Sequence, residues 1–154
     1  MSSNLQALSD AGVSIWLDDL SRDRLQSGSL AELIASSNVV GVTTNPSIFA
    51  AAIKGSQLYK EDILALKAKG ENVVSIVTAL TTSDVKAACD LFLETFSTTK
   101  YVDGRVSIEV DPFLAHQTDA TIEQGKALWK LVDRPNLLVK VPATLEGLPA
   151  IREL

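Results

Sequence analysis

Three ionisable side chains stand within or at the end of short apolar segments of this chain. They are Asp18 in Ile-Trp-Leu-Asp, Glu109 in Val-Ser-Ile-Glu-Val and Lys140 in Leu-Leu-Val-Lys-Val. An apolar site favours the free amine of a lysine over the ammonium, and a free amine can attack a carbonyl to form a Schiff base. The iminium then withdraws electrons, so that an adjacent C–C bond can break or form, while carboxylates move the protons. The pattern predicts carbonyl chemistry on Lys140.

A fourth apolar segment ends in Gly-Val-Thr-Thr-Asn-Pro and supplies Thr43, Thr44 and Asn45. In parallel α/β folds, residues at the carboxyl ends of different strands meet at one edge, where ligands bind. We therefore expect these polar residues and the three ionisable ones to form one reaction centre. Thr43 and Asn45 can also serve only as turn and cap residues, and for Asn45 capping and ligand contact are compatible.

A structural role is the alternative for the charged residues. A lysine near a strand end can extend to solvent or form an ion pair with Glu109 or Asp18. Asp19 and Asp111 are expected to be exposed or to cap loops, although the pattern alone leaves the choice between Asp18 and Asp19 open. The occurrence of such residues on three separate strands favours the catalytic interpretation.

The elements that must position these residues are short strands alternating with helices. The strands are predicted at 13–17, 39–44, 105–110 and 137–141. This alternation implies a parallel sheet with crossover helices, and both a barrel and an open doubly wound sheet satisfy it.

Helix boundaries can be predicted from caps and periodicity. Ser29 and Glu32 fit a capping box, and Asn45 and Pro46 suit an N-cap and a first helical position. The apolar stripe after Thr82 is helical, as is segment 118–132, and a last helix is expected near residue 145. The apolar stripe after Thr82 comprises Val85, Ala88, Cys89, Phe92 and Phe96. The crossover between the second and third strands should hold two or three helices, with breaks at Gly55 and Gly70.

Composition narrows the class of protein. The 154 residues are 46% hydrophobic and 21% charged, with a net charge of −5 spread along the chain, so a nucleic-acid binder or polybasic membrane protein is not expected. Cys89 is the single cysteine, which excludes an intrachain disulfide, and His116 has no partner at metal-ligand spacing. Residues 1–8 lack the pattern of a signal peptide, and no apolar run nears the roughly 18 residues of a membrane span, so the cytoplasm is expected.

Four segments of the chain resemble transaldolases and the related fructose-6-phosphate aldolases. Val-Gly-Val-Thr-Thr-Asn-Pro-Ser-Ile at 40–48 is similar to the second-strand motif, and Leu-Leu-Val-Lys-Val-Pro-Ala at 137–143 to the motif that carries the Schiff-base lysine. Leu17 and Asp18 resemble the first-strand acid motif, and Ser-Ile-Glu-Val-Asp at 107–111 the third-strand one. Segments 94–104 and 143–149 look most like the larger bacterial transaldolases.

The resemblance implies an α/β fold of the (β/α)8 TIM-barrel type and a role for each site residue. Lys140 would form the Schiff base, Asp18 would act as acid/base in C–C cleavage, and Glu109 would activate water. Asn45, Thr43 and Thr44 would bind substrate. The implied reaction belongs to the pentose phosphate pathway and moves a dihydroxyacetone unit from sedoheptulose 7-phosphate to glyceraldehyde 3-phosphate. The resemblance implies no metal and no organic cofactor.

The resemblance covers only about the first four βα units of such a barrel. We therefore expect residues 1–154 to be a single domain, the truncated N-terminal half of a barrel, with little activity alone and open edges that favour self-association. One alternative is an enzyme like fructose-6-phosphate aldolase, which releases free dihydroxyacetone. Others are a catalytically inactive half-barrel that self-associates and an open flavodoxin-like binding module.

Overall fold

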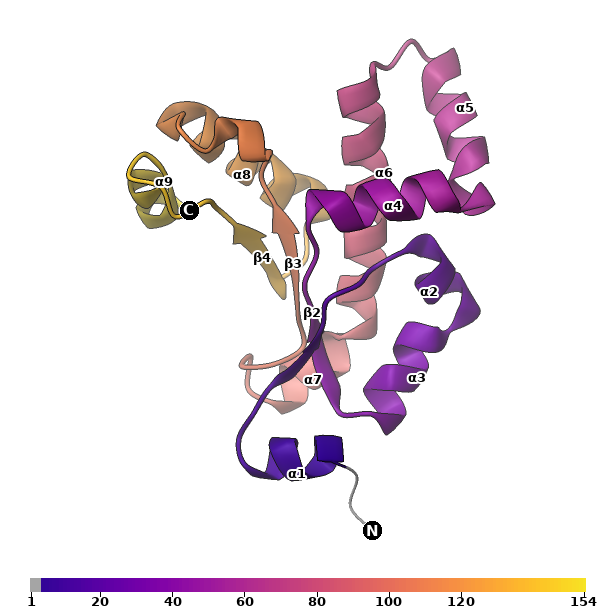
Figure 1. The fold of residues 1–154 in the computed structure, drawn as a ribbon, viewed down its shortest axis with the longest axis vertical. Helices are drawn as coiled ribbons and strands as arrows, with labels where there is room; N and C mark the ends of the chain where they lie inside the picture. The colour runs from indigo at the N-terminus through magenta and orange to yellow at the C-terminus, as the bar shows by residue number, and fades with distance from the viewer. Residues whose placement is uncertain (1–3) are drawn as a thin grey trace.

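One parallel sheet forms the centre of the fold. The computed structural model describes residues 4–154, and Figure 1 shows the course of the chain. The strands are β1 (Ile15–Leu17), β2 (Val39–Val42), β3 (Arg105–Glu109) and β4 (Leu137–Lys140). Their spatial order is β1-β2-β3-β4, and each neighbouring pair is parallel. Strand order thus follows chain order, as in a barrel, and the reversal typical of a doubly wound sheet is absent from residues 4–154.

Helices connect all four strands. α1 (Asn4–Asp10) precedes β1, and α2 (Arg22–Ser27) and α3 (Ser29–Ser36) link β1 to β2. The crossover to β3 contains α4 (Pro46–Gly55), η1 (Gln57–Tyr59), α5 (Lys60–Ala68), α6 (Val73–Leu91) and α7 (Leu93–Thr98). η2 (Pro112–Leu114) and α8 (Thr118–Val132) lead to β4, and α9 (Gly147–Glu153) follows it.

The helices cover one face of the sheet. α3 contacts β2, α6 contacts β3, and α8 contacts β4. The strand residues beneath these helices belong to the apolar core, and they include Val42, Val106, Ile108 and Leu137. Burial of these side chains against the helices is the main source of stability, at roughly 1.5–3 kcal/mol for each fully buried large aliphatic side chain.

The opposite face of the sheet carries the polar strand residues. Side chains alternate between faces along a strand, so neighbours of the core positions in sequence lie on this second face. They include Trp16, Thr43, Ser107, Glu109, Leu138 and Lys140. Leu138 is 39% exposed, and β1 and β4 each have one hydrogen-bonded neighbour within residues 4–154. The second face therefore remains partly open in the described part of the chain.

The predicted strands and most predicted helices are confirmed. All four strands occur where expected, with slightly shorter ends. Asn45 caps α4, because its Oδ1 accepts a hydrogen bond from the Ile48 amide at 3.0 Å, and Pro46 is the first helical residue. The predicted apolar stripe is buried in α6, α7 and the residue between them.

Two details of the helix predictions are wrong. α3 is capped by Gly28 and not by Ser29, because Gly28 ends α2 and starts α3 in a left-handed conformation (φ 79°), which leaves Ser29 inside the helix. The crossover holds four α-helices where two or three were expected, although α4 does end at Gly55. The last helix, expected near residue 145, is confirmed, because α9 begins at Gly147, whose amide donates to the Thr144 hydroxyl at 3.0 Å.

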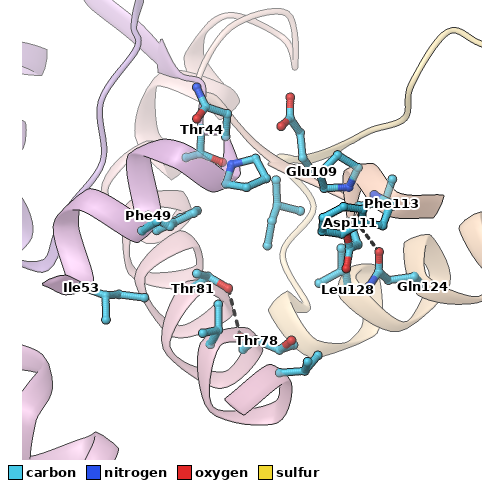
Figure 2. A pocket seen from close by; sticks show the side chains of 18 of the residues that line it. Thr44, Phe49, Ile53, Thr78, Thr81, Glu109, Asp111, Phe113, Gln124 and Leu128 are labelled. Carbon is cyan, nitrogen blue, oxygen red and sulfur yellow. Dashed lines mark hydrogen bonds between the residues drawn. The ribbon is translucent and has the colours of Figure 1, made fainter. Parts of the chain in front are cut away.

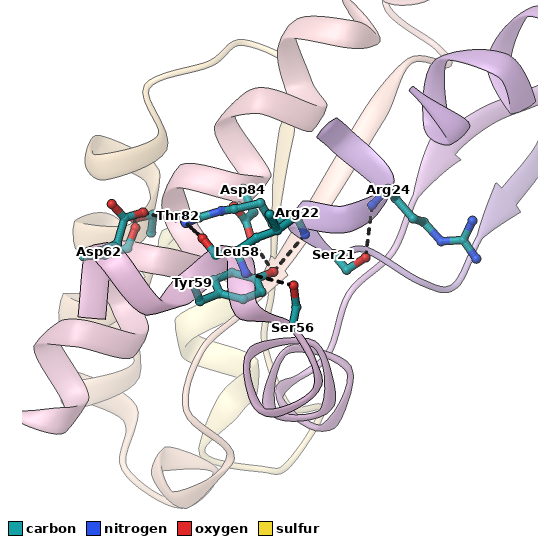
Figure 3. A network of polar contacts seen from close by, with 10 residues as sticks. Ser21, Arg22, Arg24, Ser56, Leu58, Tyr59, Asp62, Thr82 and Asp84 are labelled. Carbon is teal, nitrogen blue, oxygen red and sulfur yellow. Dashed lines mark hydrogen bonds and ion pairs between the residues drawn. The ribbon is translucent and has the colours of Figure 1, made fainter. Parts of the chain in front are cut away.

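A polar cluster, most of it buried, joins the four elements α2, η1, α5 and α6 (Figure 3). The Arg22 guanidinium of α2 donates through Nε to Asp84 of α6 at 3.0 Å and through Nη1 to Asp62 of α5 at 2.5 Å. The hydroxyl of Tyr59 donates to Asp84 at 2.7 Å and accepts from the Arg22 amide at 2.8 Å. Arg22, Tyr59 and Asp84 are all buried, so the cluster pairs charges that would otherwise be costly to desolvate.

None of the helices in the described part of the chain is long and apolar enough to span a membrane. The expectation that residues 1–8 carry no signal peptide falls partly on residues 1–3, which lie outside the described residues, while residues 4–8 belong to α1.

Candidate active site

Lys140 lies at the carboxyl end of β4 on the partly open face of the sheet. Its Nζ is 2.5 Å from Oε1 of Glu109, 2.9 Å from the carbonyl oxygen of Thr44 and 3.3 Å from Oγ1 of Thr43. An ammonium has three N–H donors, and this geometry supplies one acceptor for each. The lysine is therefore held in one place by groups from β3 and from the end of β2.

The sheet register brings these residues together. Glu109 and Lys140 are direct partners across β3 and β4, so their side chains leave the same face side by side. Thr43 continues the hydrogen bonding beyond β2, because its amide donates to the carbonyl of Leu17 at 2.9 Å. Residues separated by almost 100 positions in the chain thus meet because parallel strands end at one edge.

The site is more exposed than the sequence indicated. We expected burial to favour the free amine of Lys140, but its side chain is 39% exposed and that of Glu109 is 28% exposed. The lysine also forms an ion pair with the Glu109 carboxylate. The physical reason for the difference is that the second face of the sheet has no covering layer in residues 4–154.

The two threonines play different parts in this arrangement. Thr43 is partly exposed, and its hydroxyl accepts from Lys140 and from the Ser107 hydroxyl at 3.0 Å. Thr44 is fully buried, and its hydroxyl donates to the Ser107 carbonyl at 2.8 Å. The Thr44 side chain is thus used to join β2 to β3, while its carbonyl holds the lysine. The structure makes Thr43 the more accessible of the two to a ligand.

Asn45 combines a structural contact with a free group. Its carbonyl oxygen caps α4, and the side chain is only partly buried. The Nδ2 amide forms no hydrogen bond with any residue between 4 and 154. A ligand at the carboxyl edge of the sheet can therefore receive a hydrogen bond from this group without loss of the helix cap.

Asp18 is not brought into contact with the lysine. It follows Leu17 directly at the carboxyl end of β1, so it lies at the same edge of the sheet, but β1 and β4 are the two outer strands. Its side chain is exposed and makes no ion pair or hydrogen bond within the described residues. The neighbouring Asp19 pairs with Arg24, with Nη2 at 2.7 Å from Oδ2. The choice of Asp18 over Asp19 as the available acid is consistent with this pairing, and its catalytic role stays a prediction.

A cavity lies beside the carboxyl end of β3, and Glu109 is among its lining residues. It has a volume of about 470 Å³ and lies between α4, α6 and α8, beside the end of β3 (Figure 2). Its walls are mostly apolar, with Phe49, Ile53 and Leu128 on its sides, and the Glu109 carboxylate points away from the floor that Thr78 and Thr81 form. Lys140 and Thr43 do not line this cavity. The lysine site on the sheet face is therefore distinct from this cavity.

Two further polar residues, Asp111 and His116, follow the carboxyl end of β3. Asp111 caps η2, since its Oδ1 accepts from the Phe113 amide at 2.9 Å, and this confirms its expected capping role. His116 pairs with Glu146, with Nδ1 3.0 Å from Oε2, and both side chains are well exposed. Among residues 4–154 no cluster of three or more His, Cys, Asp or Glu residues is suited to a metal ion.

Ser107 is the residue that sequence reasoning missed. It contacts both threonines, and at 2% exposure it is buried in the middle of β3. A signal was present, because a serine two residues before a candidate catalytic acid on an apolar strand points to the same face as that acid.

The chain is similar to known proteins over almost its whole length. Residues 15–154 match the family described as Transaldolase/Fructose-6-phosphate aldolase. The chain is 60% identical over 148 residues to a transaldolase of Mycolicibacterium smegmatis, and the match covers 96% of this chain and 40% of that relative. It is 58% identical over 153 residues to a transaldolase of Acidothermus cellulolyticus, with 99% of this chain and 41% of the relative covered. The chain thus spans about 40% of the length of these curated relatives.

Proposed function

Because this chain belongs to the transaldolase/fructose-6-phosphate aldolase family, we propose that it supplies the Schiff-base lysine of a transaldolase. The reaction would move a dihydroxyacetone unit from sedoheptulose 7-phosphate to glyceraldehyde 3-phosphate, as a step of the pentose phosphate pathway. The observation that carries the proposal is the contact set of Lys140, whose Nζ is held by Glu109, the Thr44 carbonyl and Thr43 at the carboxyl edge of the sheet.

The first step is formation of the imine. Glu109, 2.5 Å from Nζ, accepts a proton from the ammonium, and the free amine then attacks the C2 carbonyl of the ketose phosphate. The carbinolamine loses its hydroxyl as water, with protons relayed by Glu109 through water, and the iminium remains. Hydrolysis at the end of the reaction follows the same steps in reverse. No metal or organic cofactor enters the proposal, because the iminium itself is the electron sink.

Cleavage and transfer require a second acid/base group, for which we propose Asp18. The carboxylate takes the proton of the C4 hydroxyl, the C3–C4 bond breaks, and its electron pair enters the iminium to give an enamine. Erythrose 4-phosphate leaves as the aldehyde product. The enamine then attacks the carbonyl carbon of glyceraldehyde 3-phosphate, the acid returns the proton, and hydrolysis releases fructose 6-phosphate.

The hydroxyl groups of the dihydroxyacetone unit would be bound by residues at the end of β2. The Nδ2 amide of Asn45 makes no hydrogen bond within residues 4–154, and Thr43 has a partly exposed hydroxyl beside Lys140. The Thr44 carbonyl accepts a hydrogen bond from Lys140, and the buried Thr44 hydroxyl donates to the Ser107 carbonyl. The proposed substrates are sugar phosphates, and the cytoplasm is the compartment expected for such metabolism.

Reductive trapping tests the proposal directly. Treatment with fructose 6-phosphate and borohydride should reduce the iminium to a stable secondary amine, which peptide mass mapping should locate at Lys140. Lys140→Met should remove the adduct. Lys126 is a matched internal control, because it is also paired with a carboxylate, Glu153 at 2.7 Å, but lies away from the sheet edge. Equal labelling of Lys126 and Lys140 would overturn the proposal.

The related aldolase activity is the nearest alternative, since the matched family includes both enzymes. An aldolase releases free dihydroxyacetone from fructose 6-phosphate without an acceptor aldehyde. A transaldolase forms its product only when the acceptor is present. Product analysis with and without glyceraldehyde 3-phosphate distinguishes the two activities.

A non-catalytic, self-associating half-barrel is the second alternative. It is favoured by the unpaired edges of β1 and β4 in the described residues and by the exposure of Leu138. We expect a preparation of residues 1–154 alone to show little transaldolase activity and to associate through these edges. Light scattering of a chromatographic fraction tests the association, and substantial turnover by a verified 154-residue preparation would contradict the expected inactivity.

A further inference from the structure

Ser107 takes no part in the chemistry proposed above, yet it lies at the centre of the site's hydrogen bonds. It is 2% exposed and lies on β3, two residues before Glu109 and on the same sheet face. Its oxygen accepts from the Thr44 amide at 3.4 Å, and its hydroxyl donates to Oγ1 of Thr43 at 3.0 Å. Because Ser107 lies on the face opposite the core residues Val106 and Ile108, packing in the apolar core does not account for its buried hydroxyl.

The hydrogen bonds at Thr43 have a defined direction. A threonine hydroxyl can accept two hydrogen bonds and donate one. Its two acceptor positions receive Ser107 Oγ at 3.0 Å and Lys140 Nζ at 3.3 Å. No acceptor for the Thr43 hydrogen exists among residues 4–154, so this hydrogen is available to a ligand on the partly open face.

These hydrogen bonds form a series in which each group donates to the next, from the Thr44 amide to Ser107 and from Ser107 to Thr43. The Thr44 amide cannot accept, so it fixes Ser107 as the acceptor at that contact, and the Ser107 hydroxyl hydrogen is then free to donate to Thr43. Because the Thr44 hydroxyl donates to the Ser107 carbonyl, β2 and β3 are also locked at this position. The series ends at the hydrogen of the Thr43 hydroxyl, whose oxygen is 3.3 Å from Nζ of Lys140.

We propose that Ser107 is a positioning residue that orients the hydroxyl of Thr43 as a donor toward a hydroxyl oxygen of the dihydroxyacetone unit bound to Lys140. This inference rests on the proposed function and deepens it, because it assigns the recognition of a substrate hydroxyl to a specific pair of residues. When Lys140 becomes an iminium it no longer donates to Thr43 as an ammonium does, and the hydrogen bond from Ser107 then remains to hold Thr43 in place.

The test compares two small ketones that differ in their hydroxyl groups. The chain is treated with cyanoborohydride and either dihydroxyacetone or acetone, and the trapped adduct on Lys140 is quantified by peptide mass mapping. Both ketones depend equally on the amine of Lys140, so the ratio of the two trapping rates isolates recognition of the hydroxyls. The unmodified chain should favour dihydroxyacetone.

Ser107→Thr and Ser107→Val provide a matched pair of variants, because they have the same shape and differ in the hydroxyl. Any cost of the additional methyl group in the buried site is common to both. Ser107→Thr should keep the preference for dihydroxyacetone, and Ser107→Val should lower it by about three- to tenfold, the value of one hydrogen bond. Thr43→Val should lower it equally, and the double variant Thr43→Val/Ser107→Val should lower it no further, as expected for residues that act as one unit.

The outcomes distinguish this inference from the proposed function. If the unmodified chain yields no adduct on Lys140, both the proposed function and this inference are wrong. If it yields the adduct but Ser107→Val keeps the same ketone preference as Ser107→Thr, only the inference is wrong. An equal fall in both trapping rates also contradicts it, since that result would mean that Ser107 affects only the amine.

Discussion

Glu109 and Lys140 are register partners on adjacent parallel strands, and their side chains form a 2.5 Å ion pair at the carboxyl edge of the sheet. In the proposed mechanism, this pair joins a proton acceptor to the amine that must lose a proton before it can attack a carbonyl. Both side chains retain contact with solvent, so the ion pair adds little to stability. Its value lies in the placement of the two groups.

Glu109→Gln should therefore separate chemistry from stability. The amide keeps nearly the same shape but cannot accept the proton, so trapping of dihydroxyacetone on Lys140 should slow by roughly 10²-fold or more. The free energy of unfolding should change by less than about 1 kcal/mol in urea titrations, because the pair is partly exposed.

Asp111→Asn is the matched control for this variant. Asp111 is the next carboxylate along the chain, and it caps η2 through an oxygen that asparagine retains. Its replacement should leave the trapping rate unchanged. An equal loss of rate in both variants would indicate a general effect of negative charge at the sheet edge, and not proton transfer by Glu109.

Asp18→Asn should affect a later step than Glu109→Gln does. Asp18 has no contact with Lys140 in the described residues, so imine formation should persist, while C–C cleavage should slow by about 10²- to 10⁴-fold. The chain spans about 40% of the length of its relatives, so turnover is best measured in a chimera. In it, residues 1–154 are joined to the remaining portion of the Mycolicibacterium smegmatis transaldolase.

Asp19→Asn in the same chimera is the control for position. Asp19 is adjacent in sequence but is paired with Arg24, so its replacement should leave both trapping and turnover close to those of the parent. Loss of turnover in Asp19→Asn with retention in Asp18→Asn would reverse the assignment of the acid.

The sequence predicted the strands well because each strand is a short apolar segment between helical ones. The helix-capping role of Asn45 was equally accessible, since the Asn-Pro pair has a specific conformational preference. Lys140, Glu109 and Thr43 could be grouped in advance because they terminate strands that run the same way.

Exposure of the site and the buried cluster around Arg22 could not be predicted in the same way. The exposure of the Lys140 side chain depends on what covers this face of the sheet. That covering is set by the arrangement of all the strands and not by the residues around Lys140. Arg22 and Asp84 are separated by 62 positions. Each is a charged residue in a helix that also has an apolar face, so each is expected on the exposed side. No local pattern shows that their polar groups are buried against each other.

Asp84→Asn tests the energetic weight of this cluster. Asp84 is 2% exposed and accepts hydrogen bonds from Arg22 and from Tyr59. The substitution leaves the buried guanidinium without its main counter-charge, so the free energy of unfolding should fall by about 3 kcal/mol. Asp62→Asn is the matched control on the same guanidinium. The Asp62 side chain is 56% exposed, and its loss should cost no more than about 1 kcal/mol. Similar costs for the two variants in urea titrations would show that burial does not determine the strength of these contacts.

Cys89 should make the stability depend on pH in the alkaline range. The thiol is fully buried in α6, and burial raises its pKa from 9.0 to about 12. Below pH 9 the thiol is protonated in both the folded and the unfolded chain, so its contribution is fully present. Between pH 9 and 12 the unfolded chain loses this proton while the folded chain keeps it, and stability falls by about 1.4 kcal/mol per pH unit.

Cys89→Ala isolates this effect from the other groups that titrate at high pH. At pH 7.5 the variant should be less stable than the parent by about 1–2 kcal/mol, because a buried atom is removed from the core. That difference should shrink from pH 9 to pH 10, since only the parent has a thiol to ionise on unfolding. Urea titrations of both chains at each pH give the difference directly, and a difference that stays constant would mean that the Cys89 thiol ionises as readily in the folded chain as in the unfolded one.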